Sequence, residues 1–246
     1  MAVAVSACGG ASGPQAADST PPASAGSATT VSATATPTPT PTATPSATPS
    51  AKAYTADQLA AIVGQLRDSA DRRLSVLPSA DLASSLEQAK AAIASMHVAP
   101  AECQDMAASS NVSAFEGAAM AAGQSIDTAS GSMSIMTLAA GLDESVLATI
   151  AGQLDRLDAC AHVTMTAAGM EYAVTLTPVE GAGSVPKTVA YRTDTKSPDG
   201  KVHSTIKAQA VHQGVLMTAV AIGGESEADA VRRAGALLDS AAALVK

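Results

Sequence analysis

Large aromatic side chains are nearly absent from this sequence of 246 residues. It has no tryptophan, one phenylalanine and three tyrosines, so the residues that dominate many protein cores and interfaces contribute little. Residues of apolar type make up 47% of the chain, but 57 of them are alanines. We therefore expect a core of Ala, Val, Leu, Ile and Met, and an aliphatic binding surface rather than one that stacks against sugars.

Basic residues are also scarce. The chain has 14 Lys and Arg against 22 Asp and Glu, a net charge of −8, and no basic stripe, which argues against nucleic acid as a partner. It contains no uninterrupted apolar run of 18 residues, so we expect no membrane-spanning helix in it.

Charge is almost missing from the first 50 residues, where Asp18 is the only charged side chain and eight of the 13 prolines occur. The rest of this stretch is mostly Ala, Ser, Thr and Gly, with a T-P-T-P-T-P repeat at 36–41 that favours extended polyproline conformation. Such a composition cannot bury enough surface to offset its ordering entropy. We predict a disordered tether at 9–52 and a single folded domain at 53–246.

The residues before the tether resemble a bacterial lipobox. Val5-Ser6-Ala7-Cys8-Gly9 places two small residues between an aliphatic residue and a cysteine. We expect Cys8 to carry a diacylglyceryl anchor with fatty acyl chains such as palmitate. Only seven residues precede Cys8, and none is Lys or Arg. Residues 1–8 are therefore interpreted as the remnant of a lipoprotein signal peptide: either the true start codon lies upstream, or the chain is truncated.

Two cysteines remain for the folded region, Cys103 and Cys160. An extracytoplasmic location would permit a disulfide between them. A metal site with His97 and His162, which lie six residues before Cys103 and two residues after Cys160, is an alternative, although neither spacing matches the usual zinc loops. Free thiols are the third possibility.

Helical periodicity dominates the first part of the folded region. Thr55 and Gln58 form a capping-box pattern, and the apolar residues that follow have helical spacing as far as residue 70, which predicts a first helix. A second helix is predicted from about residue 79 and is ended by Pro100. Residues 101–108 could add a short helix, 117–123 are ambiguous, and 132–139 resemble a strand. Another amphipathic helix is predicted from Val146 to Cys160.

After Cys160, apolar and polar residues alternate with a period of two residues, the pattern of a β-strand. Strands are predicted at 162–166, 171–176, 187–195, 202–211 and 215–222, the last apolar on both faces and therefore central in the sheet. A closing helix follows, with Glu225, Glu227 and Asp229 at its start, where its dipole favours acids. Its expected buried stripe comprises Val231, Ala234, Leu238, Ala241 and Val245. The predicted class is α+β: helices first, then an antiparallel meander of about five or six strands, with the C-terminal helix across one face.

Motifs for catalysis are mostly missing. Ser184 and Lys187 match S-x-x-K, the nucleophile motif of penicillin-binding proteins and serine β-lactamases. That motif requires Ser and Lys on one face of a helix, whereas the neighbouring glycines and Pro186 predict a loop here. Met133 and Met136 could suggest a Cu(I) site, because thioethers are suitable copper ligands. Residues three positions apart on a strand, however, point to opposite faces of the sheet. The four histidines are scattered, with His203 and His212 expected on opposite faces of one strand. We expect no metal, no cofactor and no enzymatic activity.

Several contexts together resemble a known family: the Cys8 lipobox, the Thr/Pro tether, Pro100-Ala101-Glu102-Cys103, Leu157-Asp158-Ala159-Cys160, and the apolar last strand entering the final helix. They resemble actinobacterial cell-envelope lipoproteins, and more narrowly the PknH-like extracellular sensor domain family over residues 55–246. The resemblance implies an antiparallel sheet with flanking helices, forming a cleft for an unidentified ligand. That family typically has two disulfides, whereas this domain has cysteines for one.

The function expected from the sequence is therefore binding rather than catalysis. We expect a lipid-anchored, extracytoplasmic, sensor-like domain with a cleft of Met, Ala and Val for an apolar or cell-wall ligand. An envelope hydrolase or transferase with dispersed catalytic residues, and a scaffolding lipoprotein without a small ligand, are the alternatives.

Overall fold

The computed structural model describes residues 54–104 and 115–246. Cys8, the tether at 9–52 and the second half of the short helix expected at 101–108 lie outside these ranges, so the boundaries predicted at residues 8 and 52 stay predictions. None of the helices in the described ranges combines the length and apolar character needed to cross a bilayer.

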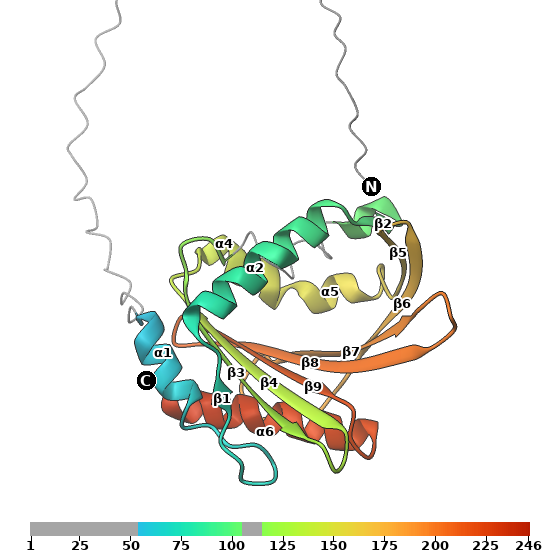
Figure 1. Cartoon of the computed structure of the whole chain (residues 1–246). Helices are drawn as coiled ribbons and strands as arrows, with labels where there is room; N and C mark the ends of the chain where they lie inside the picture. Colours follow the sequence, from blue (N-terminus) through green and yellow to red (C-terminus); the bar gives the residue numbers. More distant parts are fainter. Residues whose placement is uncertain (1–53, 105–114) are drawn as a thin grey trace, which may run out of the picture. The chain divides into compact units, whose positions relative to one another are not determined.

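Within the described residues, nine strands form one antiparallel sheet in the order β1-β3-β4-β9-β8-β7-β6-β5-β2 (Figure 1). Their bounds are β1 (Ser75–Val76), β2 (His97–Ala99), β3 (Ala119–Asp127), β4 (Ser132–Ala140), β5 (His162–Ala167), β6 (Met170–Pro178), β7 (Val189–Lys196), β8 (Val202–His212) and β9 (Val215–Ile222). The predicted α+β class is confirmed. The expected five or six strands are too few, because β1, β2 and β3 were not predicted as strands.

The predicted division into a helical half and a sheet half is also wrong, since four of the nine strands precede residue 141. The prediction for β9 is confirmed: it lies inside the sheet between β4 and β8. Its residues at 215, 217, 219 and 221 are buried on one face, while Thr218 and Val220 lie on the other.

Helices cover both faces of the sheet (Figure 1). The helical elements are α1 (Ala56–Val63), α2 (Ser79–Ala94), the 3-10 helix η1 (Ala101–Cys103), α4 (Glu144–Ala151), α5 (Gln153–Leu157) and α6 (Glu227–Leu244). Helix α6 packs on β9, β8 and β4, and α1 packs on β3 and β4. Helices α2, α4 and α5 lie over the opposite face.

Two predicted helices are shorter in the structure. The capping box of Thr55 and Gln58 is present, but α1 ends at Val63 rather than near residue 70. The helix expected from Val146 to Cys160 is divided at Gly152 into α4 and α5. Leu66 is nevertheless 1% exposed, because the chain after α1 continues along the same core.

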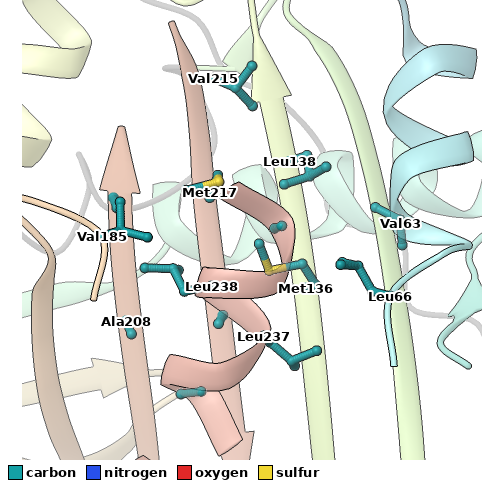
Figure 2. Close-up of a cluster of buried hydrophobic side chains, with 14 of the residues drawn as sticks. Val63, Leu66, Met136, Leu138, Val185, Ala208, Val215, Met217, Leu237 and Leu238 are labelled. Atoms are coloured by element: carbon teal, nitrogen blue, oxygen red, sulfur yellow. The ribbon is translucent and has the colours of Figure 1, made fainter. Parts of the chain in front are cut away.

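The main hydrophobic core lies between the sheet and helices α1 and α6 (Figure 2). Met136 and Leu138 from β4 and Met217 from β9 meet Leu237 and Leu238 from α6, all fully or almost fully buried. The predicted stripe on α6 is confirmed at 234, 238, 241 and 245, whereas Val231 is only half-buried. Ser226 caps the helix by accepting a hydrogen bond from the backbone N–H of Asp229.

A buried arginine joins α6 to the sheet. Arg233 is 5% exposed, and its Nε donates to Asp229 Oδ2 at 2.9 Å. Its Nη1 donates to the carbonyl of Met133 (3.1 Å) and to Ser134 Oγ (3.0 Å), and its Nη2 donates to the carbonyls of Ile222 and Gly223. These partners satisfy a charge that would otherwise be costly inside the protein.

A disulfide joins Cys103 of η1 to Cys160, which follows α5, across 57 residues of sequence. This confirms the predicted bridge. Both sulfur atoms are bonded to each other, so the thiolates required by the metal alternative are not available. Gln104 supports the same region: its Oε1 accepts from the N–H of Val98 at 2.8 Å, and its Nε2 donates to the carbonyl of Met96.

We predict that Arg233→Met lowers the free energy of unfolding by about 3 kcal/mol, because it leaves Asp229 and several carbonyls without their buried donor. Arg232→Met is the matched control, since Arg232 pairs with the same Asp229 but its side chain is 70% exposed. The control should cost less than about 1 kcal/mol. Urea unfolding followed by circular dichroism measures both, and equal losses would contradict the buried role of Arg233.

We predict that reducing the disulfide lowers the free energy of unfolding by about 4 kcal/mol, because the bridge limits the entropy of a 57-residue loop in the unfolded chain. Urea unfolding with and without reductant gives this difference. Mass spectrometry after alkylation should show two additional adducts only in reduced protein. The same number of adducts without reduction would mean that Cys103 and Cys160 are free thiols.

Candidate functional site

Helix α2 differs from α6 in how it meets the sheet. Among its 16 residues none is buried, whereas seven residues of α6 are buried. The side of α2 nearest the sheet includes Ala89, Ile93 and, just after the helix, Met96, and these remain half-exposed. An apolar helix face that buries no side chain indicates that the space below it is incompletely filled.

That space is a cavity of about 480 Å³ between α2, α5 and the sheet. Its volume lies within the range of about 300–1,000 Å³ found for small-molecule sites. The lining is mainly aliphatic and thioether. It comprises Ala89, Ala92, Ile93, Met96, Val98, Cys103, Gln153, Leu157, Val163, Met165, Val174, Leu176, Tyr191, Thr193, Thr205, Lys207 and Val220.

The sheet side of the cavity is set by strand register. Lys207 on β8 pairs opposite Tyr191 on β7 and Val220 on β9, so these three side chains form one row. Thr205, two residues before Lys207 on β8, pairs opposite Thr193 on β7, so both threonines lie on the same face as Lys207. Residues 206, 208 and 210 of β8 point into the main core instead. One face of β8 is thus apolar, and the face toward the cavity is polar.

Lys207 is the only charged side chain among the described residues that line the cavity. Its Nζ lies 5.7 Å from the centre of the Tyr191 ring, a cation–π contact. No carboxylate in the described part of the chain lies within ion-pair distance of it. The ammonium group therefore has no counter-charge among the described side chains.

Arg192, the next residue on β7 after Tyr191, shows the opposite situation. It lies on the other face of the strand, where its Nε donates to Asp194 Oδ2 at 2.8 Å and its Nη1 bonds to Glu227. The hydrogen bonds to Asp194 and Glu227 raise the pKa of the Arg192 guanidinium above its usual value. Arg192 thus has two carboxylate partners, whereas no described carboxylate pairs with Lys207.

Gln153, the first residue of α5, contributes a second unusual group. The residue is 3% exposed and lines the cavity, yet neither its Oε1 nor its Nε2 has a hydrogen-bond partner in the described structure. Leaving a buried amide unpaired costs about 1–3 kcal/mol. Because Gln153 borders the cavity, a ligand there could supply the missing partners once the buried amide turns toward it.

Gln209 extends the polar face of β8 beyond Lys207. Its Nε2 donates to Thr218 Oγ1 at 2.9 Å, while its buried Oε1 has no partner among the described residues. It pairs opposite Thr218 on β9. Gln209 does not line the cavity, so we assign it a supporting position beside the site.

The structure separates the other candidates from this cavity. Ser184 and Lys187 lie in an irregular loop, where the Ser184 N–H donates to Asp239 Oδ1 at 2.7 Å, so the helical geometry of S-x-x-K is not formed. Met136 is buried in the main core and Met133 lies on the opposite face of β4, as predicted. His203 and His212 lie at the two ends of β8.

Sequence reasoning foresaw a lining of Met, Ala and Val but missed Lys207 and Gln153. The available signal for Lys207 was the T-I-K-A-Q-A alternation beside a strand that is apolar on both faces. A polar face next to such a buried strand indicates that the polar side chains also lie under cover. For Gln153, the glycine at 152 marked a break that would place a new helix start there.

No family model matches the sequence, and no curated protein matches it. Solved structures with some likeness include the extracellular domain of PknH from Mycobacterium tuberculosis, with a TM-score of 0.45 and 16% identity, over 78% of this chain and 98% of that one. Another is an Rv0999 ortholog from Mycobacterium smegmatis, with a TM-score of 0.40 and 16% identity, over 61% of this chain and 76% of that one. At these values neither neighbour identifies a ligand or an activity for this chain.

Proposed function

We propose that this protein is a lipid-anchored, extracytoplasmic binding module, without enzymatic activity, that holds an apolar cell-envelope molecule between α2, α5 and the sheet. The observation that carries the proposal is the aliphatic cavity of about 480 Å³ below a helix that buries no side chain. Filling such a cavity removes apolar surface from water, which contributes roughly 25 cal/mol per Å².

The composition of the lining supports binding over catalysis. Its described residues include no carboxylate and no histidine, and the one cysteine among them is held in the disulfide. Acid–base or nucleophilic catalysis by Ser, Cys or His would need such groups to converge on one point. A mostly apolar wall with a few polar groups is instead the usual composition of a binding site.

The location is proposed from the sequence together with the disulfide. A bridge between Cys103 and Cys160 is typical of oxidising, extracytoplasmic compartments. The lipobox at Cys8 and the Thr/Pro-rich stretch that follows would attach the domain to the membrane at a distance. A diacylglyceryl anchor supplies two chains, which suffices for stable attachment.

We predict that protein purified from an actinobacterial host retains a non-covalent lipid-like ligand, detected by native mass spectrometry. Ala89→Phe should abolish this adduct, because the ring enters the cavity from α2. Ala91→Phe is the matched control, since Ala91 is exposed on the same helix and does not line the cavity. Circular dichroism melts of both variants verify folding.

Equal adduct in the two variants would place the ligand elsewhere. Consistently ligand-free wild-type protein would contradict the binding proposal and favour a scaffolding role. Chemical conversion of the bound molecule over time would favour an envelope hydrolase or transferase.

We predict that the protein expressed from its own locus partitions into the detergent phase of Triton X-114, and that Cys8→Ala moves it to the aqueous phase. The physical reason is loss of the acyl chains, each buried CH₂ of which contributes about 0.8 kcal/mol to membrane binding. Intact mass should show the lipid on wild-type protein only. A wild-type protein that stays aqueous, with Cys8 unmodified, would disprove the anchor.

A further inference from the structure

We infer that the ligand is an anionic amphiphile: an aliphatic chain bearing one carboxylate or phosphate head, with the head bound by Lys207 and Gln153. This inference rests on the proposed binding function and specifies the class of ligand for the same cavity. It comes from the two polar groups in the cavity whose bonding within the described protein is incomplete.

The first step concerns the charge of Lys207. Its Nζ has the Tyr191 ring as neighbour and no carboxylate of the described chain at ion-pair distance. Beside it in the row lies Val220, which is apolar. Lys207 is half-buried, and an ammonium group beside aliphatic walls attracts an anion more strongly than one surrounded by bulk water.

The second step concerns the amide of Gln153. Lys207 lines the cavity from β8, whereas Gln153 lines the same cavity from α5. Its two N–H groups can donate to the oxygens of a carboxylate or phosphate. An anion between these groups would satisfy a cation and a donor that the described protein leaves unsatisfied.

The third step concerns the remainder of the ligand. Away from Lys207 the lining is aliphatic, with Val163, Met165, Val174 and Leu176 on β5 and β6 facing Ile93 and Met96. This surface fits a chain of CH₂ groups and offers it few hydrogen bonds. Thioethers such as Met96 and Met165 can adapt to chains of different shape.

The same groups argue against other ligand classes. A cationic ligand would meet Lys207 without a carboxylate in the described lining to offset it. A sugar would find one aromatic side chain, Tyr191, whose ring is already in contact with Lys207. A ligand with several charges would find one cation, so a single anionic head is the best match.

The test compares three probes of equal chain length: dodecanoate and dodecyl phosphate below their micellar concentrations, and dodecanol below its solubility limit. Isothermal titration calorimetry with delipidated protein should show that at least one anion binds about tenfold more tightly than dodecanol, the gain expected from one charge-assisted hydrogen bond. Preference between the two anions distinguishes a carboxylate from a phosphate head.

Lys207→Met should remove the anion preference while leaving dodecanol affinity within about twofold, because Met keeps the aliphatic stem. Lys201→Met is the control, since Lys201 lies outside the cavity with its side chain 75% exposed. It should retain the preference. Equal binding of all three probes by wild-type protein, or an undiminished preference in Lys207→Met, would overturn the inference.

Gln153→Leu separates a ligand contact from a structural role. Removing the unpaired amide should raise the melting temperature of the ligand-free protein by about 2–4 °C. The same change should weaken binding of the preferred anion several-fold, with little effect on dodecanol. A lower melting temperature, or unchanged anion affinity, would contradict the role assigned to Gln153.

The two proposals fail in different ways. If wild-type protein binds dodecanol and the anions equally, the cavity is an apolar site and only the inference about the head is wrong. If it binds none of the three probes, the proposed binding function is wrong as well.

Discussion

The rest of the structure depends on how closely α6 lies against the sheet. Small residues make this approach possible, because Ala230, Ala234 and Ala241 of α6 are buried. The loop between β6 and β7 also lies close to the helix, since a Cβ on Gly235 would lie 2.4 Å from the backbone nitrogen of Gly183. Arg233 then fixes the helix by bonding to carbonyls at the ends of β4 and β9. Small side chains at these positions are therefore a structural requirement of this face, where a larger side chain would push the helix from the sheet.

Because α6 and α1 hold the core on one face, the other face carries less of the stability. Helix α2 buries no side chain there, and the amide of Gln153 has no partner in the described structure. Both features cost stability, and proteins tend to keep such costs where they serve a function. The two faces of the sheet therefore differ: the face toward α6 carries the main core, and the face toward α2 and α5 carries smaller apolar clusters and the candidate site.

Much of this fold could be predicted because its physical signals are local. Alternation along β4 to β9 and the apolar stripe of α6 follow from periodicity within each segment. Strand β3 was missed because the alanines at 118–119 and 121–122 favour a helix. Its Gly123 leaves room for the side chain of Val63, and this contact between residues distant in sequence cannot be recognised from the local pattern. Lys207 was missed for a similar reason: a lysine on an alternating strand resembles a fully solvated one until the cavity that it lines is known.

The nature of the cavity wall limits how the site can discriminate among ligands. An aliphatic lining distinguishes chains that differ by one CH₂ only weakly, because each contributes little and thioethers can rearrange around it. Hydrogen-bonded and charged contacts discriminate more strongly, since a ligand that lacks the matching group leaves the site unsatisfied. In this cavity such contacts can come mainly from Lys207, held against the Tyr191 ring, and from Gln153. Selectivity should therefore reside in the head of the ligand, with the chain contributing affinity.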